Sequence, residues 1–74
     1  MHGVYVLGSV KVGKLYIGSA RDIKARLAEH NAGYVPATKA RRPFKLLYCE
    51  LYASRIDAMH REQYLKTGWG EKIS

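Results

Sequence analysis

The chain has 74 residues, which is enough for one small domain and too few for two. A domain of this size buries only about 60% of the surface that its unfolded chain exposes, which disfavours a deep cofactor cavity and favours a shallow surface site. Lys and Arg number 13 against six Asp and Glu, giving a formal net charge of +7, and 47% of the residues are hydrophobic. We therefore expect a globular domain with a positively charged face. Nucleic acid is the leading partner for such a face, and an anionic membrane surface is the alternative.

The cysteine content and the apolar segments narrow the class of protein further. Cys49 is the single cysteine, so it cannot form an internal disulfide or a zinc site of the CxxC kind, and it fits the reducing cytoplasm. The apolar run from Val4 to Leu7 is too short for a signal sequence or a membrane span. We expect one cytoplasmic domain over residues 1–74, with Cys49 as a small core residue.

The first twenty residues predict a β-hairpin. Residues 3–9 and 14–19 are rich in β-branched and aromatic side chains, and a short connection joins them. Because side chains alternate along a strand, Tyr16 is expected on the same face as Gly18. The pattern does not decide whether Tyr5, on the first strand, shares that face.

Residues 21–32 are predicted to form a helix. Ile23 and Leu27 lie four residues apart, and His30 extends the same side. Gly33 is placed to cap the C-terminal end.

A loop with two prolines follows, and residues 44–52 then predict a third strand. Strict alternation would place Leu47, Cys49 and Leu51 on one face of this strand and Leu46, Tyr48 and Tyr52 on the other.

A second helix is predicted over residues 54–66. It is expected to begin at Ser54, with Asp57 in the position of a capping box, and to end at Gly68 and Gly70. The predicted order β-β-α-β-α indicates an α+β domain with helices packed on a small sheet.

Glu62 is the first candidate for chemistry, because it lies beside the expected apolar stripe of this helix, formed by Ala58, Met59 and Leu65. A carboxylate in that position requires a cation or a hydrogen-bond partner. It could form a structural ion pair, or it could hold a divalent metal together with water and a substrate phosphate. The residues alone leave both interpretations open.

Arg26, His30 and two tyrosines are further candidates. Arg26 and His30 lie one helical turn apart, and these residue types bind phosphate and move protons near neutral pH. Tyr5 and Tyr16 would place two phenols beside one patch if they face the same way, although half-buried strand tyrosines are also typical of a structural role. A tyrosine base requires its pKa of about 10 to be lowered by a cation, for which Lys14 is a candidate.

Residues 38–45 contain four basic side chains and no acidic one: Lys39, Arg41, Arg42 and Lys45. Together with Lys14 near the hairpin turn, this segment predicts contacts to a nucleic-acid backbone. A solvated basic loop is the competing interpretation.

These residues together resemble the two-part signature of the GIY-YIG nuclease superfamily. Gly3-Val4-Tyr5 and Tyr16-Ile17-Gly18 match its two halves, with Val4 where isoleucine is common. The match continues through RDIKARLAEHN, Thr38, RRPFKLLY and AMHREQYLK, so it covers nearly the whole chain. The chain most resembles small stand-alone bacterial members, which are related to the nuclease domain of the UvrC excision-repair subunit and to structure-specific nucleases. The resemblance implies a three-stranded antiparallel sheet flanked by helices, with the site on one side of the sheet.

The resemblance also implies hydrolysis of a nucleic-acid phosphodiester with a single divalent ion, Mg²⁺ or Mn²⁺. Glu62 would bind the metal and Arg26 would hold the scissile phosphate. Tyr5 and Tyr16 would flank the attacking water, with Tyr5 favoured as the general base, and His30 would assist at the phosphate. These roles agree with the chemistry, because a metal and an arginine stabilise charge on the phosphate while a phenol accepts a proton.

Two functions follow from the sequence. The leading one is a metal-dependent DNA endonuclease, structure-specific and linked to repair or recombination. The alternative is a nucleic-acid-binding or partner-binding module without turnover, which needs only the positive charge. RNA stays open as a substrate. No second DNA-binding or zinc module is visible, so we expect target choice to come from substrate shape or from a protein partner.

Overall fold

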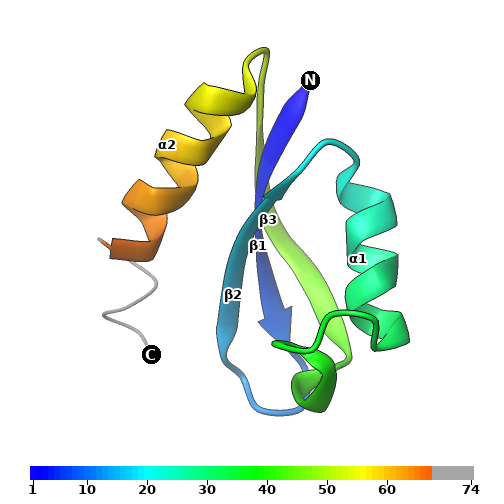
Figure 1. Ribbon diagram of the computed structural model, residues 1–74. Helices are drawn as coiled ribbons and strands as arrows, with labels where there is room; N and C mark the ends of the chain where they lie inside the picture. Colours follow the sequence, from blue (N-terminus) through cyan, green and yellow to red (C-terminus); the bar gives the residue numbers. More distant parts are fainter. Residues whose placement is uncertain (68–74) are drawn as a thin grey trace.

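Three strands and two α-helices follow the predicted order in the part of the chain that the computed structural model describes, residues 1–67 (Figure 1). The elements are β1 (His2–Ser9), β2 (Leu15–Ala20), α1 (Ile23–Ala32), the short 3-10 helix η1 (Lys39–Arg41), β3 (Phe44–Tyr52) and α2 (Arg55–Leu65). Apart from η1, which lies in the predicted loop, each element begins and ends within two residues of its predicted boundary. Gly68 and Gly70, which were expected to end the second helix, lie outside the described residues.

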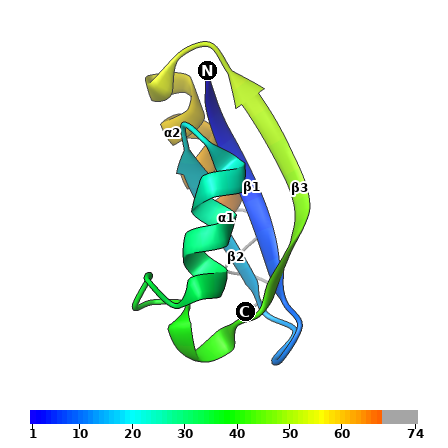
Figure 2. The ribbon, with the colours of Figure 1, turned by 90° about the vertical axis from the view of Figure 1, so that its right-hand side faces the viewer.

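The strands form an antiparallel sheet in the order β2-β1-β3, which makes β1 the central strand. This confirms the predicted α+β fold with a three-stranded antiparallel sheet flanked by helices. The helices α1 and α2 cover opposite faces of the sheet, while β2 and β3 form its two edges (Figures 1 and 2). The central position of β1 explains why most of its side chains are buried.

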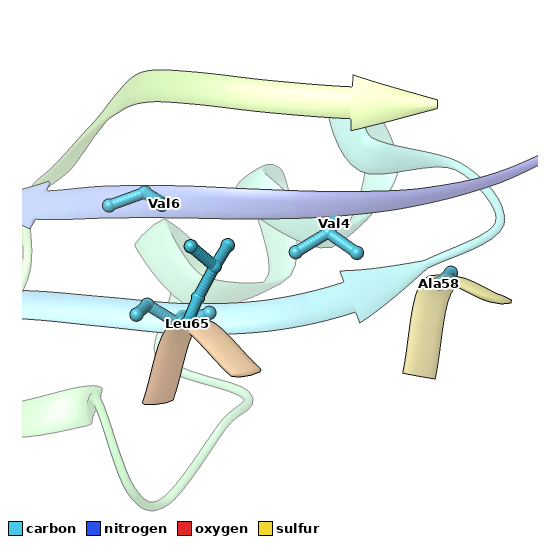
Figure 3. Close-up of a cluster of buried hydrophobic side chains, with 5 residues drawn as sticks. Val4, Val6, Ala58 and Leu65 are labelled. Atoms are coloured by element: carbon cyan, nitrogen blue, oxygen red, sulfur yellow. The ribbon is translucent and has the colours of Figure 1, made fainter. Parts of the chain in front are cut away.

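An apolar cluster closes the face of the sheet that α2 covers. Val4 and Val6 of β1 and Ile17 of β2 pack against Ala58 and Leu65 of α2. Figure 3 shows the two helical residues facing the two valines. Burial of each large aliphatic side chain stabilises the fold by roughly 1.5–3 kcal/mol relative to exposure.

Met59 does not belong to this apolar stripe, contrary to the prediction. Its exposed fraction is 45%, whereas that of Ala58 is 0%. Consecutive residues of an α-helix are separated by about 100° around its axis, so these neighbours cannot both face the sheet. The stripe is therefore narrower than predicted.

The edge strand β3 departs from the predicted alternation. Its pairing with β1 shifts between Val6 and Leu7, so that Val6 lies opposite Tyr48 and Leu7 lies opposite Leu46. The extra residue in β3 forms a β-bulge, which reverses the alternation beyond it. Leu46 consequently shares the face of Cys49, whereas strict alternation had placed these two residues on opposite faces.

Cys49 is exposed, so the expectation of a small core residue is wrong. Most of β3 is exposed in the same way, and its large side chains Leu46, Leu47, Tyr48 and Leu51 have exposed fractions of 40–62%. An edge strand has a neighbour on one side only, and two short helices do not extend over its whole length. Hydrophobicity alone therefore overestimated the burial of this strand.

Local capping groups fix the ends of the helices. Asp22 caps α1 by accepting a backbone hydrogen bond at 3.1 Å, and Ser54 caps α2 in the same way at 3.2 Å. Ser54 is the N-cap residue of α2, as predicted. Among residues 1–67, the carboxylate of Asp57 accepts no hydrogen bond from the backbone N–H of Ser54, so the predicted capping box is incomplete. Gly33 ends α1 with a φ of 87°, a conformation that favours glycine. Among the described residues, no helix combines the length and hydrophobicity needed to cross a membrane.

Candidate active site

Tyr5 and Tyr16 share the face of the sheet that α1 covers, which decides the orientation that the sequence left open. In the pairing of β1 with β2, Tyr5 lies opposite Gly18 and Tyr16 lies opposite Leu7, so the two phenols are diagonal neighbours. Their ring centroids are 6.5 Å apart, with 29° between the ring planes. The exposed fraction of Tyr5 is only 2%, whereas Tyr16 is half-buried. Tyr16 is therefore the phenol that a ligand reaches more easily.

Gly18 provides the space for the hydroxyl of Tyr5. A Cβ atom at residue 18 would lie 2.5 Å from Tyr5 Oη, well inside van der Waals contact. The Tyr5 ring cannot move aside freely, because Tyr16 and His30 pack against it. The glycine of the second signature segment thus has a direct packing role.

His30 lies next to both phenols and is fully buried, with an exposed fraction of 0%. Its Nε2 lies 3.2 Å from Tyr5 Oη, and its Nδ1 lies 2.7 Å from Thr38 Oγ1. The imidazole also meets the ring of Tyr16, at 4.9 Å between centroids. Both ring nitrogens are occupied by protein groups, so His30 can influence a bound phosphate only through Tyr5.

Arg26 supplies a positive charge that acts on both Tyr5 and His30. Its guanidinium forms an ion pair with Glu29 at 2.7 Å, and the two side chains are 39% and 46% exposed. Burial raises the pKa of Tyr5 above its usual value, and the Arg26 guanidinium offsets only part of that increase. Burial lowers the pKa of His30, and the charge of Arg26 lowers it further. At neutral pH the cluster therefore holds a protonated phenol beside a neutral imidazole.

Glu62 reaches the same region from the opposite face of the sheet. The hydroxyl of Ser19 in β2 donates to its Oε1 at 2.7 Å, and Lys66 Nζ lies 2.8 Å from its Oε2. Ser19 follows Gly18, so the carboxylate and the Tyr5 hydroxyl contact neighbouring residues of one edge strand. The negative charge of Glu62 also contributes to the raised pKa of Tyr5. The five candidate residues therefore lie on both sides of the β2 edge, whereas the resemblance implied one side of the sheet.

An ion pair between α2 and β3 fixes the rotation of α2. Arg61 Nε lies 2.9 Å from Glu50 Oε1, and the hydroxyls of Tyr48 and Tyr52 donate to the same carboxylate. These hydroxyls, together with Arg61, lower the pKa of Glu50 to about 2. Since Arg61 and Glu62 are consecutive on the helix, the pairing of Arg61 with β3 turns Glu62 toward β2.

The oxygen atoms around Glu62 fit a hard divalent cation. Mg²⁺ prefers oxygen ligands and keeps several of its waters, so one carboxylate can serve as its main protein ligand. The Glu62 carboxylate and the Ser19 hydroxyl are such donors, and the ammonium of Lys66 already lies against the carboxylate. Within residues 1–67, no three His, Cys, Asp or Glu side chains cluster as metal ligands. The described residues thus suit an ion that retains water.

Two of the predicted DNA-binding side chains lie together at the hairpin end of the sheet. Lys39 and Arg42 line an open hollow with Lys11 of the β1–β2 turn. Figure 1 shows this turn and η1 at the same end of the molecule. Three cations around one hollow form a surface suited to phosphate groups.

The other three basic candidates lie elsewhere. Arg41 donates to the carbonyl of Ala37 at 2.8 Å, so part of its guanidinium stabilises η1. Lys45 lies in β3 opposite Gly8 of β1, and Lys14 lies just before β2. The predicted basic segment is therefore distributed over more than one surface.

The fold and the arrangement of these side chains define a class of protein, and the chain belongs to the GIY-YIG catalytic domain family, whose model matches residues 1–71. This family implies a nuclease domain with DNA as substrate, and the match confirms the resemblance found in the sequence. The UPF0213 protein of Staphylococcus aureus strain Mu3 is 42% identical over 67 residues, which cover 89% of this chain and 80% of the relative. The UPF0213 protein SH2523 of Staphylococcus haemolyticus is 43% identical over 67 residues, with the same coverage of 89% and 80%. The solution NMR structure of the UPF0213 protein BH0048 from Bacillus halodurans is 32% identical. It matches with a TM-score of 0.57 and covers 97% of this chain and 77% of that one.

Sequence reasoning assigned no role to several side chains that contact the candidate residues: Ser19, Thr38 and Lys66. Strand alternation could have indicated Ser19, because the residue after Gly18 must face the side of the sheet that α2 covers. The spacing of Glu62 and Lys66 is typical of a helical ion pair. Nothing in the sequence indicated that Thr38 lies against His30, since the contact depends on the path of the loop.

Proposed function

We propose that this chain is a metal-dependent endonuclease that hydrolyses phosphodiester bonds in DNA. One observation carries the proposal: Tyr5 and Glu62 contact neighbouring residues of the edge strand β2. Tyr5 lies over Gly18 on one face, and Glu62 accepts a hydrogen bond from Ser19 on the other. A phosphate placed at this edge would have Arg26 on the side of α1 and the carboxylate on the side of α2.

Arg26 would bind the scissile phosphate. Its guanidinium is partly exposed, and its present partner, Glu29, is an exposed carboxylate on the same helix. Exposed ion pairs of this kind contribute only about 0–1 kcal/mol, so a phosphate can replace the carboxylate with little loss. A fork of N–H donors facing the phosphate stabilises the charge that develops in the transition state.

Tyr5 and His30 would move the proton of the attacking water. The raised pKa of Tyr5 keeps its phenol protonated at neutral pH, so it can act as a base only while passing on its own proton. The lowered pKa of His30 keeps the imidazole neutral, and its Nε2 lies 3.2 Å from the phenol oxygen. As a water O–H bond breaks, Tyr5 Oη would take that proton and give its own to His30 Nε2. The water oxygen would bond to phosphorus while the bond from phosphorus to the leaving DNA oxygen breaks, and that oxygen would take a proton from solvent water. Tyr16, the more exposed phenol, would orient the water.

Glu62 would hold the divalent ion, Mg²⁺ or Mn²⁺, with Ser19 orienting its carboxylate. Such an ion supplies positive charge that stabilises the phosphate oxygens during hydrolysis. The basic side chains would bind the DNA backbone on either side of the cleavage site: Lys14, Lys39, Arg41, Arg42 and Lys45, together with Lys11. Backbone contacts carry no sequence information, so branched or damaged DNA in repair or recombination is the substrate class we propose.

Cleavage of branched and single-stranded DNA in the presence of Mg²⁺ or Mn²⁺ tests the proposal. Glu62→Gln and Arg26→Ala are each expected to reduce the rate by about a hundredfold or more, the usual size of such losses. Asp57→Asn and Arg55→Ala remove an acidic and a basic side chain from exposed positions of α2 and serve as matched controls. Equal rates for the native protein and Glu62→Gln would assign the activity to a contaminant. If the native protein binds DNA in a salt-sensitive way but cleaves none of it, a binding module without turnover is favoured instead.

A further inference from the structure

Three polar side chains are buried together on the side of the sheet that α1 covers. The exposed fractions are 2% for Tyr5, 0% for His30 and 0% for Thr38. Among the described residues, no buried polar side-chain atom lacks a hydrogen-bond partner. The three groups therefore form a connected chain in which each proton has a definite position.

The direction of each hydrogen bond follows from the two ends of this chain. At one end, the Tyr5 hydroxyl carries a proton that needs an acceptor, and among residues 1–67 its hydrogen-bond partner is His30. His30 Nε2, at 3.2 Å, supplies that acceptor. At the other end, the carbonyl of Val35 can only accept, and it lies 3.4 Å from Thr38 Oγ1. The threonine oxygen is then free to accept a hydrogen bond from His30 Nδ1 at 2.7 Å.

The opposite arrangement leaves one proton without a partner. If Thr38 donated to Nδ1, then Nε2 would carry the proton and donate to Tyr5. The Tyr5 oxygen would then accept from His30, and no further acceptor for the phenol proton lies within hydrogen-bond distance among residues 1–67. A buried donor without an acceptor is destabilised by about 1–3 kcal/mol, so the first arrangement is favoured.

We propose that Thr38 is a positioning residue that holds His30 in the Nδ1-protonated tautomer, with the lone pair of Nε2 directed at Tyr5. This inference rests on the proposed function, because it is the state of His30 that can take the phenol proton. In the other tautomer, Nε2 already carries a proton and cannot accept one from Tyr5.

The loop between α1 and β3 is built to keep the threonine hydroxyl in place. The backbone N–H of Thr38 donates to the carbonyl of Val35 at 3.1 Å, and the carbonyl of Thr38 accepts from Arg41 at 3.0 Å. A β-branched side chain also has few rotamers, so the hydroxyl is held with little freedom. These contacts place one oxygen atom against one nitrogen of His30.

Long-range ¹H–¹⁵N NMR spectra of the histidine-labelled protein at slightly alkaline pH test the inference without any DNA. His30 in the native protein should show the Nδ1-protonated pattern, with the more exposed His2 and His60 as internal references. Thr38→Val should shift His30 toward the Nε2-protonated tautomer, and Thr38→Ser should keep the native pattern. Thr67→Val is the matched control, because Thr67 is exposed and, within residues 1–67, its hydroxyl donates to backbone carbonyls of its own helical turn.

Kinetics supply the second readout. Thr38→Val should lower kcat for DNA cleavage about tenfold with KM unchanged, because substrate binding does not involve the threonine, and Thr38→Ser should restore kcat. An Nε2-protonated His30 in the native protein, or a native tautomer in folded Thr38→Val, would overturn the inference. If Thr38→Val does not fold, the native and Thr38→Ser spectra decide the question. Native protein with the expected tautomer but no cleavage would refute the proposed function while leaving the assigned tautomer intact.

Discussion

The two faces of β1 differ in what they bury. Toward α2 the strand presents Val4 and Val6, which pack in an apolar cluster. Toward α1 it presents Leu7, which belongs to a second apolar cluster, and Tyr5, whose hydroxyl joins His30 and Thr38 in a buried polar chain. Alternate residues of a single strand thus enter two different environments.

This contrast indicates a division between stability and chemistry. Apolar burial stabilises the fold by roughly 25 cal/mol per Å². A buried hydrogen bond adds only about 1 kcal/mol, because it replaces bonds to water. The buried polar chain therefore contributes less to stability than the apolar contacts around it, but it is where burial and charge shift the pKa values of functional groups. We expect substitutions in the apolar clusters to act through unfolding and those in the polar chain to act through activity.

Val6→Asp places a carboxylate in the apolar cluster between β1 and α2, and it has the largest expected effect. The exposed fraction of Val6 is 0%, and the buried residues of its cluster within residues 1–67 are all aliphatic. Burying a carboxylate there costs several kcal/mol, about the whole stability of a small domain. Circular dichroism should show no cooperative thermal transition. Val10→Asp, at a residue that is 58% exposed, should keep the native transition. A cooperative Val6→Asp protein that melts at the native temperature would contradict the division.

Tyr5→Phe tests the polar face. We expect DNA cleavage to fall about a hundredfold, equivalent to about 2.7 kcal/mol of activation free energy, since the proton path loses its first acceptor. The free energy of unfolding should change by only about 1 kcal/mol in urea titrations. Tyr34→Phe, at a residue that is 78% exposed, is the control. Loss of activity in proportion to the loss of folded protein would argue for a structural role of Tyr5.

The burial of His30 predicts a pH dependence of stability. In the unfolded chain its pKa is about 6.5, and in the folded protein burial lowers it. As the pH falls below about 6.5, the imidazole of His30 binds a proton in the unfolded state but not in the folded state. The free energy of unfolding should then fall by up to about 1.4 kcal/mol per pH unit, whereas above about pH 6.5 this contribution is fully present.

Urea titrations between about pH 7.5 and about pH 5.5 measure this slope. His30→Gln should remove it, and His60→Gln, at an exposed residue of α2, should leave it unchanged. If the slope is the same in His30→Gln as in the native protein, another group is responsible.

Lys66→Met has the smallest expected effect, a change in the metal affinity of Glu62 at the β2 edge. The ammonium of Lys66 lies 2.8 Å from Glu62 Oε2, so a divalent cation must compete with it. Partly exposed pairs of this kind are worth about 0.5 kcal/mol, and removing the lysine should raise Mn²⁺ affinity about two- to threefold in isothermal titration. Lys24→Met, at an exposed residue of α1, is the control. Unchanged or weaker binding of Mn²⁺ would show that Lys66 does not compete for the carboxylate.

The order and bounds of the elements were predictable because they depend on local patterns. Alternation in β1 and β2 and the helical spacing of Ile23 and Leu27 predict both the elements and their inner faces. The exposure of Cys49 was not predictable, because it depends on the edge position of β3. The bulge near Leu46 inserts one residue into the alternation, and no residue type marks it in the sequence.

For the candidate site, the sequence and the family resemblance supplied the residue types, and the structure supplied their connections. The spacing of Arg26 and His30 predicts a shared helix face, but it does not distinguish a solvated histidine from one that is fully buried. The approach of Glu62 from the other face depends on how α2 packs, which Arg61 fixes through a distant strand. The link between His30 and Thr38 depends on loop geometry, which composition does not encode.

The contact between Tyr5 and Gly18 has a consequence for how the sequence can change. The two residues lie opposite each other on paired strands, and any side chain at residue 18 would occupy the space of the phenol hydroxyl. Alanine at residue 18 becomes sterically acceptable only together with a smaller side chain at residue 5, and that exchange removes the hydroxyl. Residues 5 and 18, one in each signature segment, can therefore change only together. Along any mutational route that retains the phenol, glycine at residue 18 must persist, however far the rest of the chain diverges.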